Sequence, residues 1–278
     1  MDGKTVLITG ASAGIGLHTA IGLATLGADV VMVGRDERRT AEAASLVKTQ
    51  TGNPSVSYLI ADLSSLHEVR KLASEFKSKH KKLDVLVNNA GALFLWRKTT
   101  VDGYEMTFAL NHLNYFLLTE LLLEVLQAQP KARIVNVSSS AHYRGYINFD
   151  DLHSAKFYNG LQVYSNSKLA NVLFTYELAR RLKGSNVTAN CLHPGFVASN
   201  FALNNGFLVN IYMAFMWHRL TNEQGARTSI HLASSPDIEN VSGKFFNYTT
   251  KEKRSSGESY NESVAKRLWD VSEKLVTV

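Results

Sequence analysis

The stretch Thr9-Gly10-Ala11-Ser12-Ala13-Gly14-Ile15-Gly16 decides the fold. It follows the apolar run 6–8 and opens an amphipathic stretch that ends near Gly27. Glycine tolerates positive φ values and allows a ligand close to the backbone, and the free N–H groups of a helix N-terminus attract an anion. A second apolar run, 30–33, closes a unit of about 30 residues with the strand–helix–strand order of a dinucleotide-binding fold. The residues predicted to hold the dinucleotide are Gly10, Ser12, Ala13, Gly14, Ile15 and Gly16, the alternative being a purely structural turn.

The chain has 278 residues, of which 45% are hydrophobic. This length lies near the upper end for one α/β domain and suffices to bury a large core without disulfides or metals. We therefore expect a single domain over residues 1–278. The one cysteine, Cys191, has no partner for an intrachain disulfide, which fits a reducing compartment, and its apolar neighbours predict a buried, inert thiol.

The net charge of +6 comes from 30 Lys and Arg against 24 Asp and Glu, spread along the chain apart from a small basic cluster at 77–82. Without a basic stripe or a recognisable module, nucleic-acid binding is not expected, and the cluster is interpreted as the solvated end of a helix. Mild attraction to anionic membranes stays open. No apolar run reaches the roughly 20 residues of a membrane-spanning helix, and the start of the sequence carries no signal peptide. We expect a cytoplasmic protein, soluble or peripherally associated with a membrane.

Apolar runs alternate with helical patterns along the rest of the chain. Strands are expected at 56–60, 85–87, 134–137, 187–192 and 244–247, and helices at 38–51, 65–79, 102–126, 161–182 and 223–233. Strict alternation predicts parallel strands joined by right-handed crossovers. The expected fold is α/β, a doubly wound, mostly parallel seven-stranded sheet of the Rossmann type with helices on both faces. Ligands of such sheets bind at the carboxyl ends of the strands, so the informative residues should follow each strand.

Gly34-Arg35 follows the second strand, where a NAD site would carry Asp or Glu for the ribose 2′-hydroxyl. The missing carboxylate removes repulsion toward a 2′-phosphate, and a guanidinium is a planar, permanently charged partner for it. The sequence therefore predicts NADP(H) as cofactor, with a surface salt bridge as the alternative role of Arg35. Asp36 stands next in line and can either compete or cap the following helix.

Two further strand ends carry candidate cofactor residues. Asp62-Leu63 follows the third strand and is expected to meet the adenine or, with Ser64, to cap the helix at 65–79. Asn88-Asn89-Ala90-Gly91 follows the fourth strand, where small residues give the cofactor a close wall and amides brace the backbone. As generic loop chemistry that tetrapeptide would be unremarkable. Its position predicts cofactor contacts for Asn89, Ala90 and Gly91.

The candidate catalytic residues lie in two places, in Ser138-Ser139-Ser140 after the fifth strand and in the segment 164–168 of the next helix. A spacing of four puts Tyr164 and Lys168 on one helical face. A phenol titrates near ~10, so it is a poor acid–base group at neutral pH unless a neighbouring ammonium stabilises the phenolate. A serine hydroxyl nearby can hydrogen-bond the substrate oxygen as charge develops on it. In a dinucleotide fold this pattern predicts a hydride-transfer site, rather than a chance pair on a helix surface.

Taken together, the stretches 9–16, 88–91, 164–168 and 193–195 and the serine after the fifth strand resemble the classical short-chain dehydrogenase/reductase family over essentially the whole chain. The segments that resemble its retinol dehydrogenase-like branch are 111–113, 116–119, 134–139, 167–174 and 193–195. The long insertion between the serine and the tyrosine is also similar to that branch.

The resemblance implies a catalytic tetrad. Tyr164 would exchange a proton with the substrate oxygen, while Lys168 would lower the pKa of that phenol and hold the nicotinamide ribose. Ser139 would orient and polarise the carbonyl, chosen over Ser138 because it is the second serine of the pair that matches the family motif. Asn111 would hold the water of a proton relay to Lys168.

The resemblance also implies a nicotinamide pocket lined by Pro194, Gly195 and Val197, with the backbone of Val197 meeting the carboxamide. Ser199 stands where the family carries a threonine and keeps a hydroxyl for the phosphate. His193 precedes a proline on a strand-end loop, and we expect it to be structural rather than a base.

The stretch 201–220 is too apolar for an ordinary exposed loop. A substrate lid at about 200–222 over a lipophilic substrate is predicted, with a buried helix, a homodimer contact or interfacial membrane insertion as alternatives. The expected function is NADP(H)-dependent interconversion of a lipophilic, retinal-like aldehyde or ketone and its alcohol. The alternatives are a reductase of carrier-bound ketoacyl groups and a non-catalytic NADP(H)-sensing protein.

Overall fold

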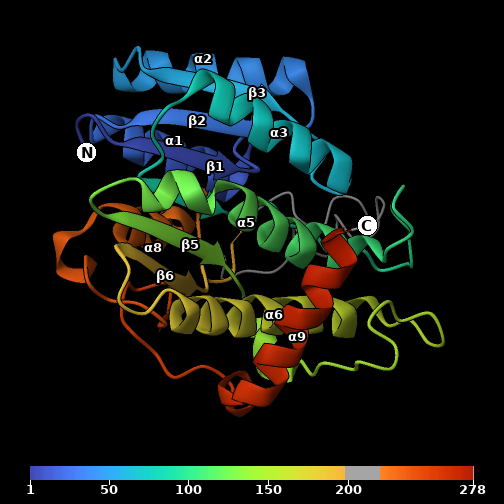
Figure 1. The fold of residues 1–278 in the computed structure, drawn as a ribbon. Helices are drawn as coiled ribbons and strands as arrows, with labels where there is room; N and C mark the ends of the chain where they lie inside the picture. The colour runs from blue at the N-terminus through green and yellow to red at the C-terminus, as the bar shows by residue number, and fades with distance from the viewer. Residues whose placement is uncertain (198–219, 278) are drawn as a thin grey trace.

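The computed structural model describes residues 1–197 and 220–277, and a seven-stranded sheet runs through it (Figure 1). The strand order is β3-β2-β1-β4-β5-β6-β7, and every neighbouring pair is parallel. The strands are β1 Thr5–Thr9, β2 Asp29–Gly34, β3 Val56–Ile60, β4 Val85–Asn88, β5 Ala132–Val137, β6 Val187–Leu192 and β7 Phe245–Phe246. The predicted doubly wound sheet is confirmed, and its pairings are all parallel rather than mostly so.

Helices cover both faces of the sheet (Figure 1). They are α1 Gly14–Thr25, α2 Glu37–Thr51, α3 Leu66–Lys79, α4 Met106–Phe108, α5 Asn114–Gln127, α6 Gly160–Arg181, α8 Asn222–Ser234 and α9 Glu262–Thr277. One hydrophobic cluster joins the sheet to α1, α2 and α8, and a second joins it to α3, α5, α6 and α9. Because side chains alternate along a strand, Leu7 faces the second cluster, while Val6 and Ile8 face the first.

The helix expected at 102–126 begins later than predicted and is irregular. Residues 99 and 105 form an antiparallel bridge, and α4 starts at Met106. The Glu105 carboxylate caps α4 by accepting hydrogen bonds from the amides of Thr107 (2.9 Å) and Phe108 (2.7 Å). A π-helical segment, Ala109–Leu113, then separates α4 from α5. The predicted start was wrong because residues 102–105 belong to a turn that ends on the capping carboxylate.

The residues predicted to cap α3, 62–64, also differ from the observed cap. The N-cap residue is Ser65, whose hydroxyl accepts from the Glu68 amide, and α3 begins at Leu66. Asp62 instead folds onto the loop, where its carboxylate accepts from the Ser64 amide (3.0 Å) and hydroxyl (2.8 Å). Asp62 and Ser64 therefore form a local turn before the cap. The helix starts one residue later than expected, so this turn is not part of its cap.

The C-terminal helix α9 was not predicted, and it lies across α6 (Figure 1). Its buried face carries Leu268, Trp269 and Val276, which belong to the cluster shared with α5 and α6. The Arg181 guanidinium of α6 lies 4.2 Å from the centroid of the Trp269 ring. This helix therefore covers apolar surface on α5 and α6.

Cys191 is buried in β6, and burial raises the pKa of its thiol to about 12, as expected for an inert thiol. Within the parts of the chain that the structure describes, no helix has the length and apolar character needed to cross a bilayer.

Candidate active site

The glycine turn between β1 and α1 lies against the loop that follows β4. Gly10 has a φ of 65°, and a Cβ there would lie 2.9 Å from the Ala90 Cα. A Cβ on Gly16 would lie 2.3 Å from the Gly10 carbonyl oxygen and 2.6 Å from the Asn89 amide nitrogen. Both glycines are therefore required by close backbone packing.

The first turn of α1 is available to an anion. Ala13, its N-cap residue, makes no side-chain cap, whereas Asp36, Ser65 and Asn159 cap α2, α3 and α6. An uncapped helix start leaves backbone N–H groups without an intrahelical partner. The glycine turn and these amides together fit the phosphates of a dinucleotide.

Asn89 joins the ends of β1 and β4. Its side-chain amide donates to the Thr9 carbonyl oxygen (2.8 Å), and the amides of Asn89 and Ala90 donate to the Thr9 hydroxyl (2.9 and 3.0 Å). A Cβ on Gly91 would lie 3.0 Å from Asn111 Oδ1 and 3.3 Å from Lys168 Nζ. The motif after β4 thus braces the glycine turn and leaves a narrow space beside the predicted catalytic residues.

The end of β2 carries the predicted determinant of cofactor choice. The Asp36 carboxylate is engaged as the cap of α2, accepting from the Arg39 amide at 2.8 Å. A Cβ on Gly34 would lie 2.2 Å from the Thr40 hydroxyl, so a carboxylate side chain does not fit there without a shift. Arg35 is exposed. Of these residues, only Arg35 offers a charged group that is not occupied as a helix cap.

Asp62 and Leu63 lie at the neighbouring strand end. The Ala61 amide donates to the Gly34 carbonyl oxygen (3.0 Å), which ties the end of β3 to the end of β2. Leu63 is buried, and the Asp62 side chain is exposed and turned onto its own loop. The predicted contact of Asp62-Leu63 with adenine stays a prediction.

The two serines after β5 have different partners on α6. The Ser138 hydroxyl donates to the Lys168 carbonyl oxygen (2.8 Å) and is buried. Ser139 caps a 3-10 turn, Ser140–Arg144, and its side chain is hydrogen-bonded to Tyr164. Desolvation raises the pKa of Tyr164 to about 12, and the bond to Ser139 is the contribution that lowers it. Ser138 therefore anchors the helix, and Ser139 faces the phenol.

Lys168 is buried on the same side of α6. Its ammonium lies 5.7 Å from the centroid of the Tyr164 ring and donates to the Val137 carbonyl oxygen at 3.1 Å. Burial lowers the pKa of Lys168 to about 7. Asn171 Nδ2 (3.4 Å) and the Tyr115 hydroxyl (3.5 Å) reach the same carbonyl. No sequence pattern indicated that Asn171 or Tyr115 would share the acceptor of the lysine.

Asn111 lies in the π-helical segment, where its side chain is engaged. Its Oδ1 accepts from the Ala92 amide (2.9 Å), and its Nδ2 donates to the Ala92 carbonyl oxygen and to the Ser167 hydroxyl (both 3.0 Å). These bonds hold the segment after β4 against α6. The predicted water relay to Lys168 stays a prediction.

The predicted nicotinamide loop follows β6. A Cβ on Gly195, whose φ is 89°, would lie 2.3 Å from the Leu220 side chain, and Val197 pairs with Leu220. Pro194 and Val197 are buried. Burial lowers the pKa of His193 to about 4, which keeps it neutral, in line with the structural role expected for it. Ser199 and nearly all of the predicted lid lie outside the described residues.

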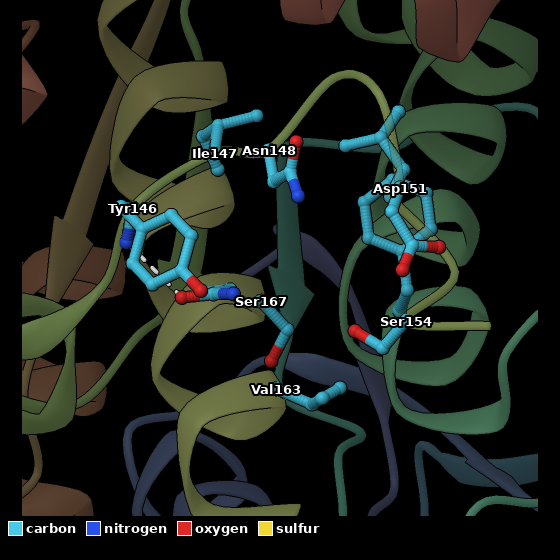
Figure 2. Close-up of a pocket in the computed structure, with 10 residues that line it drawn as sticks. Tyr146, Ile147, Asn148, Asp151, Ser154, Val163 and Ser167 are labelled. Carbon is cyan, nitrogen blue, oxygen red and sulfur yellow. Dashed lines mark hydrogen bonds between the residues drawn. The ribbon is translucent and has the colours of Figure 1, made fainter. Parts of the chain in front are cut away.

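A separate small cavity lies beside α6 (Figure 2). Figure 2 shows Ile147, Asn148 and Asp151 facing Val163 and Ser167 of α6 across it. Its volume of about 20 Å³ holds about one water molecule, which is far below the size of a substrate pocket. This cavity is therefore too small to be the substrate pocket.

Known proteins resemble both the sequence and the structure. A family model described as short chain dehydrogenase matches residues 4–206. Human retinol dehydrogenase 14 is 46% identical over 99% of this chain and 87% of its own length, and human retinol dehydrogenase 11 is 44% identical over 98% and 85%. A solved structure from Mycobacterium paratuberculosis has a TM-score of 0.81 and 36% identity, covering 100% of this chain and 94% of that one. RhlG from Pseudomonas aeruginosa, solved with NADP in its active site, has a TM-score of 0.71 and 27% identity over 93% and 97%.

Proposed function

The chain belongs to the short-chain dehydrogenase family and is an oxidoreductase, and from this premise we propose that it interconverts a lipophilic carbonyl compound and its alcohol with NADP(H). The observation that carries the proposal is the meeting of Ser139, Tyr164 and Lys168 at the carboxyl end of β5. That edge of the sheet also carries the glycine turn, braced through Asn89.

NADP(H), when bound, supplies or accepts the hydride. The glycine turn and the first amides of α1 would hold its phosphates, and Arg35 would pair with the 2′-phosphate. Gly91 would leave room beside Lys168, whose ammonium would bind the nicotinamide ribose. The fit rests on the uncapped start of α1 and on the narrow space at Gly91.

The chain's own residues would bind the substrate oxygen and move its proton. Ser139 would donate a hydrogen bond to the carbonyl oxygen and keep it beside the Tyr164 hydroxyl. With its pKa raised to about 12, the phenol holds its proton at neutral pH and can donate it to the developing alkoxide. In the oxidation direction Tyr164 would have to accept that proton, and a charged Lys168 would stabilise the phenolate.

Exposed apolar side chains support a lipophilic substrate. Leu161 lies one helical turn before Tyr164 and is 62% exposed, and Phe157 and Trp96 are 79% and 64% exposed. The segments that carry them touch, because the Tyr158 hydroxyl donates to the Phe94 carbonyl oxygen at 2.9 Å. Exposed apolar side chains on two touching segments, one of which leads into Tyr164 along the chain, favour an apolar ligand. The retinol dehydrogenase names of the relatives point the same way.

The test is NADPH oxidation with straight-chain aldehydes of increasing length, retinal and small polar aldehydes. Wild-type protein should turn over the lipophilic substrates, and Tyr164→Phe should abolish turnover. Tyr58→Phe, on the edge strand β3, is the matched control and should retain activity. Full activity of Tyr164→Phe would remove the assigned acid, and failure with every carbonyl despite tight NADPH binding would remove the proposed reaction.

The proposal also includes a cytoplasmic location, peripheral membrane contact and a homodimer. Sedimentation velocity would measure the oligomeric state. Co-sedimentation with vesicles of anionic and neutral lipids would measure membrane contact, which is rejected if the protein stays in solution with both.

A further inference from the structure

His142 lies on the 3-10 turn that Ser139 begins, and it is fully buried. Its Nδ1 lies 2.6 Å from the Ser139 carbonyl oxygen. Its Nε2 lies 3.1 Å from the backbone nitrogen of Ser256, a residue 114 positions further along the chain. The ring therefore bridges the predicted catalytic serine and a distant segment, on backbone groups at both ends.

These two backbone partners fix the protonation state of His142. A carbonyl oxygen only accepts hydrogen bonds, so Nδ1 must carry a proton and donate to Ser139. A backbone N–H only donates, so Nε2 must be unprotonated and accept from Ser256. His142 is thus neutral, with its proton on Nδ1. A second proton on Nε2 would face the Ser256 N–H and break that bond.

The Ser256 amide is itself held in place by the segment that returns after β7. This segment pairs with β7, since Glu252 bridges Phe246 and the Lys253 amide donates to the Phe245 carbonyl oxygen at 2.8 Å. The Ser255 hydroxyl joins the Tyr176 hydroxyl of α6 (2.7 Å) to the Ser259 hydroxyl (2.6 Å). The anchor of His142 is therefore tied to the sheet and to α6.

Two aromatic rings pack against the imidazole in tilted arrangements. The ring centroids of Tyr143 and Phe245 lie 4.1 and 4.7 Å from that of His142. The Tyr143 hydroxyl also donates to the Arg254 carbonyl oxygen at 2.5 Å, a second link between the serine turn and the same segment. A well-packed ring of this kind has little freedom to turn.

The charges around His142 oppose its protonation. Burial lowers the pKa of His142, and nearby Lys253 lowers it further, while the Ser139 carbonyl acts in the opposite direction. His193, at the end of β6, is also close enough for the two histidines to repel each other when charged. Other titratable or charged groups packed against this region include Tyr143, Tyr176, Arg254 and Tyr260.

We propose that His142 is a positioning residue that holds the backbone carbonyl of Ser139 while the Ser139 side chain faces Tyr164. It does so only as the neutral, Nδ1-protonated imidazole. The inference rests on the proposed function, because it takes Ser139 as the group that binds the substrate oxygen. It adds a requirement that the tetrad does not contain: the segment after β7 must be in place for the serine to be in place.

A pH dependence follows from this geometry. Because the pKa of His142 lies below its usual 6.5, the neutral form persists at neutral pH and is lost as the pH falls through the lowered value. We therefore expect kcat to fall at acid pH as His142 takes up a second proton, which gives the kcat–pH profile an acid limb. The dissociation constant of NADPH should not follow that limb, because the two ring nitrogens of His142 bond to Ser139 and Ser256 and not to the glycine turn.

Three substitutions at His142 separate the two hydrogen bonds. Asparagine places an N–H near the position of Nδ1, glutamine places a carbonyl near the position of Nε2, and phenylalanine supplies neither. We expect His142→Asn, which keeps the bond to Ser139 but not the bond to Ser256, to lose kcat by about three- to tenfold and to lose the acid limb. His142→Gln and His142→Phe should lose kcat by about 10- to 100-fold, the scale of a small misplacement of a reacting group.

Ser256 supplies a matched pair from the other side. Its φ of −61° already suits proline, so Ser256→Pro removes the N–H donor while keeping that dihedral. Within the described chain its hydroxyl makes no hydrogen bond, so Ser256→Ala keeps the donor and should behave as wild type. Ser256→Pro should lower kcat at neutral pH to about the level of His142→Asn and remove the acid limb, because the bond to Nε2 is then absent at every pH.

The tautomer is measurable without substrate, from long-range ¹⁵N–¹H spectra of the imidazoles. Buried His193 and His112 should also stay neutral at pH values where exposed histidines are charged, so the signal of His142 is assigned by its loss in His142→Asn, and we expect it to show a neutral ring with its proton on Nδ1. An Nε2-protonated ring would overturn the proposal even if the enzyme works as proposed. So would a ranking of the variants in which kcat follows the melting temperature alone. A wild type without turnover but with the expected tautomer would refute the proposed function and the role of Ser139 in it, while leaving the hydrogen-bond assignment standing.

Discussion

Replacing Arg35 by alanine should erode the preference for NADPH over NADH roughly tenfold. The structure leaves this guanidinium as the charged group at the end of β2, because Asp36 caps α2 through the Arg39 amide. Gly34 cannot be exchanged for an acid without a shift, since a Cβ there would lie 2.2 Å from the Thr40 hydroxyl. The wild type should therefore bind NADPH at least tenfold more tightly than NADH.

The size of the effect follows from the exposure of Arg35. A hydrogen bond to a charged group contributes about 1.5–3 kcal/mol. Solvent and salt screen an exposed contact, so the lower end, about 1.5 kcal/mol, applies. About 1.4 kcal/mol corresponds to a tenfold change in a dissociation constant, which gives the expected loss. The preference should also weaken as ionic strength rises.

Calorimetric titration of both cofactors at two salt concentrations measures the ratio of dissociation constants. Arg38→Ala is the matched control, because Arg38 is exposed nearby on α2 and pairs with Glu42 at 3.0 Å. Its ratio should equal that of the wild type. Equal affinities of the wild type for NADPH and NADH, or equal effects of the two alanine variants, would refute the assignment of Arg35.

Three further outcomes are expected. Tyr164→Phe should lose nearly all turnover in steady-state assays and keep its NADPH dissociation constant within about threefold, since only the proton-transfer group is removed. Gly16→Ala should lose NADPH binding and melt at lower temperature, because its Cβ would meet backbone at 2.3 Å, whereas Gly257→Ala, with nothing within 4 Å, should change neither. Without cofactor, the free energy of unfolding from urea titrations should rise between pH 7 and 10.5. The pKa of Lys168 falls to about 7 on folding, so the unfolded chain binds more protons in that window. Lys168→Met should flatten the rise.

Much of the fold could be predicted because the strands of a parallel sheet are continuous apolar runs, and two of them, β3 and β6, have the predicted bounds. The helix α9 carried a detectable signal as well, since Ala265, Leu268, Trp269, Ser272 and Val276 recur at helical spacing. The π-helical segment at 109–113 carried none. It is accompanied by the bonds from Asn111 to Ala92 and Ser167, which form only once the sheet has brought these residues together.

The candidate site also contains residues that the sequence predicts and supporting groups that it does not. Tyr164 and Lys168 could be identified together because both lie on one helix at a spacing of four, and Ser139 because it follows a strand. The groups that support them could not be found from spacing. His142 meets Ser256 across 114 residues, and the carbonyl that binds Lys168 belongs to Val137, where the side chain carries no information about a backbone acceptor.

The way Lys168 is held connects packing to function. Three donors reach the Val137 carbonyl, from Lys168 (3.1 Å), Asn171 (3.4 Å) and Tyr115 (3.5 Å), while a carbonyl oxygen has two lone pairs. The ammonium therefore shares its acceptor through long bonds in a buried place, which agrees with a pKa lowered to about 7. A buried cation held this weakly lowers the stability of the protein, yet it is free to take a stronger partner. We interpret Lys168 as a group whose poor satisfaction within the protein favours ligand binding, in the manner of other sites that give up stability for function.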